Sequence, residues 1–383
     1  MKIAFDALPL ISERMTGIGY CQAGQIQALM ALHPEEQYVM QFFATGDGGE
    51  KRKRLESYEN ARAELRQGKC SGYLYRLVSN FLPVPYNKFF GSDADITHFF
   101  NYIVPPKVSG KTVVTVHDMV YKAFPETVRG RTRYMLETGL KRSMKRADLI
   151  VTDSEFSRSE ILKYFPQWET KLRVVPCGVD RSRFRPILDS VRIDETKKLL
   201  GIDREYFLYL GTLEPRKNLR RLVIAYDGFR KGKAEYPCLV LAGGKGWLND
   251  ELMRTIKELE LEPDVKIVSY VPEENICKLM SGALAFVFPS IYEGFGMPPL
   301  EAMACGVPVL TTHAASLPEV VGDCALICDP YHTEQITDCL ERLYHDSKLR
   351  RELSAAGLKR ARIYSWENAA AALYDVYKEA LRG

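Results

Sequence analysis

The segment FPSIYEGFGMPPLEAMACGVPVLTT, residues 288–312, decides the fold class. An apolar run, AFVFPS from Ala285, leads into the Gly-rich loop Glu293-Gly294-Phe295-Gly296, and a second apolar run, VPVLTT, closes the segment. Between them, Pro298-Pro299 suit the first positions of a helix, where a missing N–H costs nothing. The order of strand, helix and strand predicts two parallel strands joined by a crossover helix over 299–305.

The same alternation extends in both directions from this segment. In the second half, further strands are expected at YFLYLGTL, PCLVLAGG, VKIVSYV and ALICDP. In the first half they are expected at KIAFDA, QYVMQFFA, ITHFFN, TVVTVHD, ADLIVTDS and LRVVPCGV. This rhythm predicts an α/β protein of two Rossmann-like doubly wound domains, which face each other across a cleft at the carboxyl ends of their strands.

A polar, charged stretch at 178–203 separates the two series of strands. We therefore expect an N-terminal Rossmann-like domain over 1–180 and a C-terminal one over 181–365. The last helical pattern, 366–383, is expected to pack back on the N-terminal domain. The length of 383 residues suits two domains, because one domain spans about 150 residues.

Composition is that of an ordinary globular enzyme, with 46% apolar and 27% charged residues. No stretch reaches the roughly 18 apolar residues of a membrane span, and the start MKIAFDALPLI suits a buried strand better than a secretory signal. Nine scattered cysteines without a CxxC pair predict buried free thiols in a reducing compartment and no metal centre. We expect a cytoplasmic protein.

Basic residues are concentrated in the first half of the chain. Residues 1–190 carry 28 Lys and Arg against 21 Asp and Glu, a net charge of +7, whereas the rest carries 25 against 28, a net charge of −3. The segment 122–146 has two acidic residues and eight basic ones, namely Lys122, Arg129, Arg131, Arg133, Lys141, Arg142, Lys145 and Arg146. Either the segment forms a solvated helix face, or its positive charge attracts an anionic membrane surface or acceptor. Nucleic acid is not expected, because no recognised nucleic-acid motif accompanies the charge.

The loop 293–296 and the helix that follows it predict an anion site, since backbone N–H groups are free at a helix start. Glu301 beside such a site suits a ribose, because its two oxygens can accept from both ribose hydroxyls. Glu301 is expected in the first turn of the helix, and the alternative is that it is only a partner of the helix dipole. Glu293 stands before the turn and is expected to face a sugar instead.

Two cations follow another strand in LGTLEPRKNLRRL, residues 210–222. Arg216 and Lys217 are expected at the mouth of a helix, where they would balance the charge of a diphosphate leaving group without a metal. Cations oppose the dipole at a helix start, so their presence there needs a reason. The alternative is two solvated surface cations.

Three further features of the first half have less specific sequence signals. Gly17 and Gly19 in Thr16-Gly17-Ile18-Gly19 allow backbone to approach a phosphate closely, although a plain tight turn explains them equally well. His117 ends the strand TVVTV, at the edge where a cleft is expected. Asp93-Ala94-Asp95 has the spacing of a metal-binding pair, but it precedes its strand at the amino end, so we do not assign it a metal.

Together these segments resemble the retaining glycosyltransferases of family 4, which have the two-Rossmann-domain GT-B fold. The versions in this chain look most like bacterial mannosyltransferases of lipopolysaccharide and polysaccharide assembly. The resemblance covers nearly the whole chain and weakens over 40–90. The matching motifs are Glu293…Glu301, Pro-Arg-Lys-Asn at 215–218, Thr-Gly-Ile-Gly at 16–19, Val-Pro-Cys-Gly-Val-Asp at 175–180 and Ser-Leu-Pro-Glu-Val at 316–320.

The resemblance implies roles for the two cations and the second glutamate. Lys217 and Arg216 would hold the donor diphosphate, and Glu301 would hold the ribose. One departure matters: many family members have Arg directly after the strand-end Gly, where this chain has Thr212. Arg216 would then take over that part.

The resemblance also implies how the rest of the donor is held. Glu293, with three backbone amides, would hold the sugar and phosphate, while Val271 would meet the base through its backbone. His117 would lie against the transferred sugar near the reacting carbon. The three amides are those of Phe295, Gly296 and Met297. His117, Lys217 and Glu293 are the residues expected to take part in catalysis.

The family retains anomeric configuration and needs no metal, which implies displacement on the front face of the sugar. From the resemblance we expect mannose to move from GDP-mannose to a lipid-linked or growing polysaccharide such as O-antigen, lipopolysaccharide core or capsule. Two alternatives stay open within the fold: another transferase that uses a UDP-sugar, and a hydrolase or epimerase of nucleotide sugars. A third, of another class, is a non-catalytic scaffold in a glycan-assembly complex.

Overall fold

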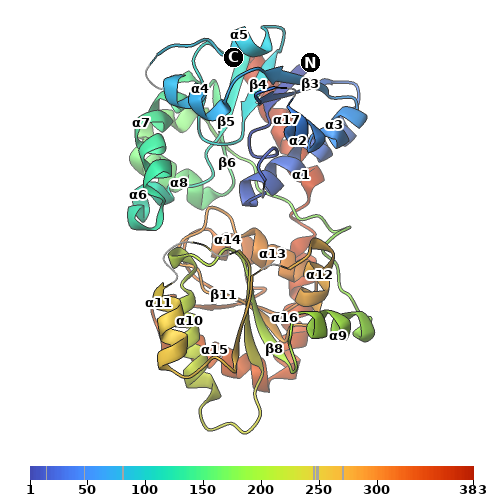
Figure 1. Ribbon diagram of the computed structural model, residues 1–383, viewed down its shortest axis with the longest axis vertical. Helices are drawn as coiled ribbons and strands as arrows, with labels where there is room; N and C mark the ends of the chain where they lie inside the picture. The colour runs from blue at the N-terminus through green and yellow to red at the C-terminus, as the bar shows by residue number, and fades with distance from the viewer. Residues whose placement is uncertain (14, 47, 80–81, 245, 247–249, 270) are drawn as a thin grey trace. The chain divides into compact units, whose positions relative to one another are not determined.

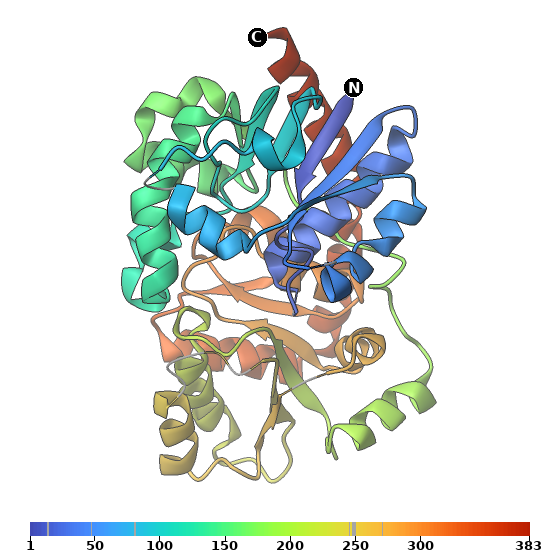
Figure 2. The same cartoon turned by 45° about the horizontal axis from the view of Figure 1, so that its top comes forward.

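The computed structural model describes residues 1–383 apart from 14, 47, 80–81, 245, 247–249 and 270. The described chain forms two compact units, one of Met1–Gly178 with Trp366–Gly383 and one of Val179–Ser365. The division after Gly178 lies two residues before the expected boundary at 180. Both termini belong to the first unit (Figure 2).

The first unit contains a seven-stranded sheet in the order β3-β2-β1-β4-β5-β6-β7. All neighbouring strands in it are parallel. The register places Ile3 of β1 opposite both Tyr38 of β2 and Ile96 of β4. The strands are β1 Lys2–Asp6, β2 Gln37–Phe43, β3 Glu64–Gly68, β4 Ile96–Phe99, β5 Lys111–Thr115, β6 Leu149–Thr152 and β7 Leu172–Val174.

Helices cover both faces of this sheet, as Figure 1 shows. They are α1 Gly17–Leu32, α2 Gly49–Lys53, α3 Glu56–Asn60, α4 Gly72–Ser79, α5 Asn87–Phe90, α6 Val120–Ala123, α7 Gly130–Arg146, α8 Glu155–Tyr164 and α17 Trp366–Arg382, with 3-10 turns at Pro125–Thr127 and Pro166–Lys171. Successive side chains of β5 point to opposite faces of the sheet, because side chains alternate along a strand. Val113 joins the core with Leu373 of α17, whereas Val114 joins the core with Leu140 of α7.

The second unit contains a six-stranded parallel sheet in the order β10-β9-β8-β11-β12-β13. Its strands are β8 Tyr206–Leu210, β9 Cys238–Ala242, β10 Val265–Val268, β11 Ala285–Phe288, β12 Val309–Thr312 and β13 Leu326–Cys328. Its helices are α9 Ser190–Leu199, α10 Leu219–Arg230, α11 Asp250–Glu258, α12 Glu273–Ser281, α13 Met297–Ala304, α14 Leu317–Val321, α15 Thr333–His345 and α16 Ser347–Ala361, with a 3-10 turn at Pro215–Lys217.

Every strand expected from the sequence is present, and the structure adds β3. The expected run VKIVSYV forms β10 over Val265–Val268, and its residue 270 lies outside the described residues. The sequence analysis missed β3 because ELRQG has a single apolar side chain. It lies at the edge of the sheet, where a strand has a neighbouring strand on one side only. The α/β fold with two Rossmann-like sheets is confirmed.

The C-terminal helix α17 lies beside α1 in the first unit (Figure 1). Gly24 of α1 makes the contact close, because a Cβ there would lie 2.2 Å from the ring of Trp366. Farther along α17, the hydroxyl of Tyr377 lies 2.7 Å from Nδ1 of the buried His98. The end of the chain is thus part of the core of the first unit.

Candidate functional site

The carboxyl ends of β8 and β11 bring together three of the predicted residues. In the sheet, β9 and β10 lie on one side of this pair and β12 and β13 on the other. Ligands of doubly wound sheets bind at the carboxyl ends of strands where the order reverses in this way. Arg216 and Lys217 follow β8, and Glu293 follows β11.

Hydrogen bonds hold the loop after β8 against the loop after β11. The 3-10 turn Pro215–Lys217 ends at Asn218, which has a left-handed φ of 61°, a conformation that Asn adopts more readily than most residues. The amide of Asn218 donates to the carbonyl oxygen of Pro289 at 3.1 Å. The N–H of Ile291 donates to the carbonyl oxygen of Arg216 at 2.9 Å.

Glu293 forms ion pairs with both predicted cations. Its Oε1 accepts from Nζ of Lys217 at 2.6 Å, and its Oε2 accepts from Nη1 of Arg216 at 2.9 Å. Nε of Arg216 also lies 2.6 Å from Oε1 of Glu214. Lys217 and Glu293 are each 7% exposed. The alternative of solvated surface cations is therefore wrong for Lys217.

The opposite charges keep Glu293 ionised in a buried place. Burial by itself would raise the pKa of Glu293, but the charges of Arg216 and Lys217 lower it to about 2. Burial and the charge of Arg216 lower the pKa of Lys217. A multiply charged anion bound at Lys217 would replace the Glu293 carboxylate as its partner. The carboxylate would then be available to accept hydrogen bonds from hydroxyl groups next to that anion.

The Gly-rich loop ends in a conformation that favours glycine. Gly296 has a φ of 119°, and a Cβ there would lie 3.0 Å from the side chain of Leu317. The hydroxyl of Ser316 lies within hydrogen-bond distance of the carbonyl oxygens of Glu293 and Phe295, at 2.9 and 2.6 Å. The loop therefore packs against α14 and the residue before that helix. The next helix, α13, begins at Met297.

The helix α13 begins two residues earlier than the expected 299, because Met297 and Pro298 already have helical backbone. Glu301 consequently lies in the second turn, and the first turn contains no acidic residue. The placement of Glu301 in the first turn is wrong. Its interpretation as a partner of the helix dipole fails with it, since that effect is confined to the terminal turn.

Glu301 is half-buried, and within the described part of the chain its carboxylate has no hydrogen-bond partner from the protein. Burial raises the pKa of Glu301 to about 7, and the charge of Arg183 offsets this only in part. A carboxylate held out of water without a donor destabilises the fold, and such groups are concentrated at functional sites. Two neighbouring hydroxyl groups would satisfy both of its oxygens.

The remaining predicted residues of the second unit surround this edge of the sheet. Val271 follows β10 and is buried, at 7% exposure. Phe295 is buried, with its ring edge-on to that of Tyr364 at 5.6 Å between centroids. Gly296 and Met297 stand at the start of α13, where the first N–H groups lack acceptors within the helix.

Gly17 and Gly19 lie inside α1 and not in a loop before it. Neither appears among the described glycines with positive φ, so the plain tight turn weighed as an alternative is wrong. A Cβ at Gly19 would lie 3.2 Å from the carbonyl oxygen of Pro9, which explains the glycine by close packing. Phosphate binding at this helix start stays a prediction.

His117 follows β5 in the first unit and is buried, at 7% exposure. Its Nδ1 lies 2.6 Å from Oδ2 of Asp153, and its Nε2 lies 2.8 Å from the carbonyl oxygen of Phe100. Both partners are acceptors, so both ring nitrogens must carry protons. Burial lowers the pKa of His117, but the charge of Asp153 and its hydrogen bond raise it to about 10. His117 is therefore an imidazolium cation.

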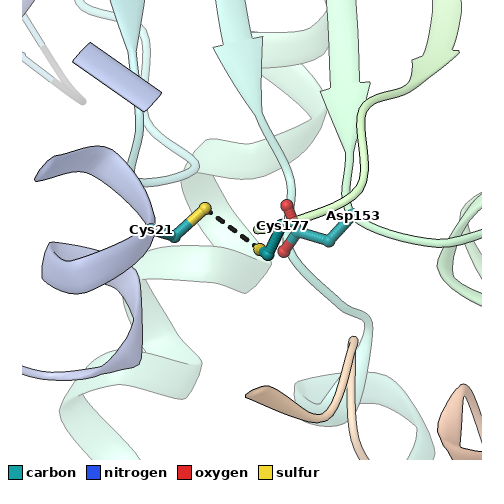
Figure 3. A group of neighbouring side chains, drawn as sticks. All are labelled: Cys21, Asp153 and Cys177. Atoms are coloured by element: carbon teal, nitrogen blue, oxygen red, sulfur yellow. Dashed lines mark hydrogen bonds between the residues drawn. The ribbon is translucent and has the colours of Figure 1, made fainter. Parts of the chain in front are cut away.

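Asp153, which follows β6, is the residue of this group that sequence reasoning missed. Figure 3 shows it next to Cys177, whose Sγ lies 3.1 Å from Sγ of Cys21 in α1. Asp153 and His117 both follow strands, and the carboxyl ends of β5 and β6 are adjacent. An acidic residue directly after a strand was the signal in the sequence, but many strands end in polar residues.

Cys21, Asp153 and Cys177 form the one described group of three side chains that are near enough to share a metal ion. They do not fit a structural zinc site, which takes four ligands and holds two sulfurs about 3.8 Å apart. The carboxylate of Asp153 is in addition hydrogen-bonded to His117. We assign no metal to the group.

The acidic pair before β4 makes structural contacts. Asp93 pairs with Lys2 at 2.5 Å and with Arg66, and Asp95 accepts from the backbone N–H of Lys2 at 2.7 Å.

The basic segment 122–146 forms α6, a 3-10 turn and α7, and all eight of its basic side chains are exposed. No described helix has the length and apolar character needed to cross a membrane.

Two family models match the chain. "Glycosyl transferases group 1" matches residues 192–360, and "Glycosyltransferase Family 4" matches residues 37–183. The chain is 37% identical over 287 residues to the O-antigen chain mannosyltransferase B of Escherichia coli, covering 74% of each protein. It is 28% identical to a serotype-specific mannosyltransferase WbdA of E. coli, over 69% of this chain but 33% of that longer protein.

Solved structures with low sequence identity have the same fold. Anabaena HepE in complex with UDP and glucose aligns with a TM-score of 0.72 at 18% identity, covering 99% of this chain and 100% of that one. Sucrose-phosphate synthase from Thermosynechococcus elongatus aligns with a TM-score of 0.71 at 19% identity, covering 99% and 98%. These matches establish the fold of the chain over its full length.

Proposed function

The chain belongs to the group 1 and family 4 glycosyltransferases of GT-B fold, and from this premise we propose that it moves mannose from GDP-mannose to a lipid-linked or growing polysaccharide. The relatives that support mannose are the O-antigen chain mannosyltransferase B and WbdA of E. coli. The acceptor would be a glycan of the O-antigen, lipopolysaccharide-core or capsule type. The protein would work in the cytoplasm, at the inner face of the cell membrane.

The observation that carries the proposal is the buried ion-pair group of Lys217, Arg216 and Glu293. A nucleotide sugar has a diphosphate next to a hydroxyl-rich ring, and this group offers cations next to a carboxylate. Lys217 and Arg216 would take the diphosphate, with the amides of Phe295, Gly296 and Met297. Glu293 would be released to accept from the sugar hydroxyls.

The nucleoside end of the donor would extend to Glu301 and Val271. Glu301 has the unpaired carboxylate that two ribose hydroxyls would satisfy. Val271 would offer its backbone to the base. On this arrangement each polar part of the donor meets a group of complementary charge or hydrogen-bonding character.

We propose transfer with retention of configuration and without a metal. As the bond between the sugar and the diphosphate breaks, Lys217 and the α13 amides would stabilise the growing negative charge on the leaving oxygen. That oxygen would accept the proton of the acceptor hydroxyl on the same face of the sugar. His117 is already doubly protonated, so its part would be to position and stabilise charge and not to act as a base.

The test is incubation of the purified protein with GDP- and UDP-sugars and a lipid-linked acceptor, with release of nucleoside diphosphate as the readout. The proposal predicts faster release from GDP-mannose than from any UDP-sugar. Proton NMR of the product then shows whether the α configuration of the donor is kept. Preference for a UDP-sugar would overturn the mannose assignment and leave the transferase assignment standing.

The same experiment separates the other candidates. A hydrolase would release free sugar at an undiminished rate when the acceptor is left out, and an epimerase would change the donor without releasing diphosphate. A scaffold would show no turnover with any donor. The buried ion pairs at Lys217 favour the transferase, because a scaffold has no need for paired charges at a ligand-binding edge.

We further propose that the basic segment 122–146 contacts an anionic membrane surface. Its eight exposed cations would each contribute about 1 kcal/mol near anionic lipid, and the contribution falls off within a Debye length. The likeness to an O-antigen chain mannosyltransferase favours this source of anions. A nucleic acid partner is not proposed.

A further inference from the structure

Cysteine thiols approach one another at three places in the described part of the chain. Cys21 and Cys177 lie 3.1 Å apart, and Cys277 and Cys305 lie 3.6 Å apart, measured between Sγ atoms. Cys328 and Cys339 share a side-chain hydrogen bond. All six are free thiols.

Access to solvent separates these pairs. Cys21 and Cys177 are each 2% exposed, and the hydrogen bond with Cys21, burial and the carboxylate of Asp153 raise the pKa of Cys177 well above its usual range. Cys328 and Cys339 are also both buried. Cys277 in α12 is half-buried and is the one thiol of the three pairs that a reagent in solution can reach. Exchange with a disulfide requires an accessible thiolate.

The surroundings of Cys277 favour that reaction. The hydrogen bond from the Cys305 thiol lowers the pKa of Cys277 to about 6, and while Cys277 is protonated its thiol donates to the carbonyl oxygen of Arg185 at 2.9 Å. Cys305 caps the end of α13 and is 2% exposed. An accessible thiol of low pKa next to a second thiol is the arrangement of a redox-active pair.

We propose that Cys277 and Cys305 form a thiol–disulfide exchange site for small disulfides, such as oxidised glutathione, that closes to an intramolecular disulfide. Closure shortens the distance between the Sγ atoms from 3.6 Å to about 2.05 Å. Side-chain rotation and a small shift of α12 against the end of α13 would supply this difference.

The reaction balances in two exchange steps. The Cys277 thiolate attacks one sulfur of the small disulfide and releases one small thiolate, which takes up a proton, leaving a mixed disulfide on Cys277. The Cys305 thiol then loses its proton and attacks Sγ of Cys277, which releases the second small thiol. Two protein thiols are oxidised and one small disulfide is reduced to two thiols.

The site connects to α13 one turn from Glu301. The backbone N–H of Cys305 donates to the carbonyl oxygen of Glu301 at 3.0 Å, so a bond from Cys305 to α12 acts on the helix that carries Glu301. We expect the oxidised form to bind GDP at least threefold more weakly than the reduced form. This expectation rests on the proposed function, whereas the thiol chemistry does not.

The experiment exposes the folded full chain to oxidised glutathione and maps disulfides by mass spectrometry of a non-reduced digest. The expected first product links Cys277 to Cys305. Cys277→Ser should slow glutathione consumption at least tenfold, and Cys305→Ser should stop the reaction at a mixed disulfide on Cys277. Cys177→Ser is the matched control in a closer but buried pair, and it should leave the rate unchanged.

A first product that links Cys21 to Cys177 overturns the proposal, because proximity would then outweigh access. An unchanged rate in Cys277→Ser overturns it as well. Mapping of the unsubstituted protein decides the question even if Cys305→Ser does not fold. Equal GDP affinity of the reduced and oxidised forms overturns the connection to α13. Absence of GDP binding in both forms counts against the proposed function and leaves the thiol result intact.

Discussion

At the candidate site, whether a buried side chain is charged depends on which opposite charge is buried next to it. Lys217 and Glu293 are both nearly inaccessible and remain ionised because each faces the other at 2.6 Å. Asp153 does the same for His117 in the first unit. Glu301 lacks such a partner, and its pKa is raised to about 7 by burial. Removing one member of a buried pair leaves the other uncompensated.

We predict that Lys217→Ala and Glu293→Ala each reduce glycosyl transfer at least about a hundredfold, by loss of preorganised charge at the leaving group and sugar. Steady-state rates of GDP release with acceptor present are the measurement. Lys257→Ala, at an exposed position of α11, is the control and should retain full activity. Near-normal turnover in both site variants would reject the assigned site.

A second prediction follows from the raised pKa of His117, about 10 compared with an ordinary value of 6.5. Because the folded protein holds this proton more tightly, the stabilisation is complete below pH 6.5 and is lost as the pH rises through 10. Asp153→Asn should be less stable at pH 7 by on the order of 2 kcal/mol, and the difference should shrink toward pH 10. Urea unfolding at pH 6, 8 and 10 measures it; a pH-independent difference would contradict the ion pair.

The third prediction concerns Glu301. It must be ionised to accept from two ribose hydroxyls, yet its pKa in the free protein is about 7. GDP binding should therefore release a proton below pH 7, and affinity should rise as the pH increases from 6 to 8. Calorimetry in two buffers of different ionisation enthalpy measures the released proton. In Glu301→Gln the release should vanish, and its persistence would show that another group titrates.

At the scale of elements, the positions of helix starts decide what the site residues can do. The sequence predicted a helix near 299–305, and the structure begins α13 at Met297. That shift moves Glu301 to the second turn. Gly17 and Gly19 likewise stand in the first turn of a helix, α1. Prolines and glycines mark a helix start to within a few residues, but packing of the preceding loop selects the first helical residue.

The basic segment 122–146, which contains Lys122 of α6 and the cations of α7, carries the fourth prediction. Replacing Lys122, Arg133, Lys141 and Lys145 with Gln should weaken binding to vesicles containing anionic lipid about tenfold or more at low salt. Co-sedimentation with vesicles at low and high salt is the measurement. The matched control replaces four exposed lysines of the second unit, namely Lys198, Lys257, Lys348 and Lys359. Equal binding of both variants would exclude the basic segment 122–146 as the contact.

At the scale of the whole molecule, each half of the chain builds its own parallel sheet, and the last helix returns to the first unit. The return depends on a close contact of α17 with α1, where Gly24 accommodates the ring of Trp366. The first unit is thus made of two segments separated by the second unit along the sequence. Its stability therefore depends on residues at both ends of the chain.

The fifth prediction tests this return. Gly24→Ala places a methyl group against the Trp366 ring and should destabilise the protein by at least about 2 kcal/mol. Gly130→Ala, where a Cβ has nothing within 4 Å, is the control and should be neutral or slightly stabilising. Thermal unfolding followed by circular dichroism measures both. Similar stability of the two variants would show that α17 adjusts freely on α1.

The sequence by itself determined the two parallel sheets and the residue types of the site, because apolar periodicity and Gly- and Pro-bearing turns are local properties of the chain. The sequence did not predict the polar edge strand β3 for the same reason, since ELRQG has no such pattern. Only the tertiary structure decided the partners: Asp153 for His117, Glu293 for both Lys217 and Arg216, and Cys305 for Cys277. Pairing depends on which strand ends and helix ends become neighbours, and that is set by packing between segments far apart in the sequence.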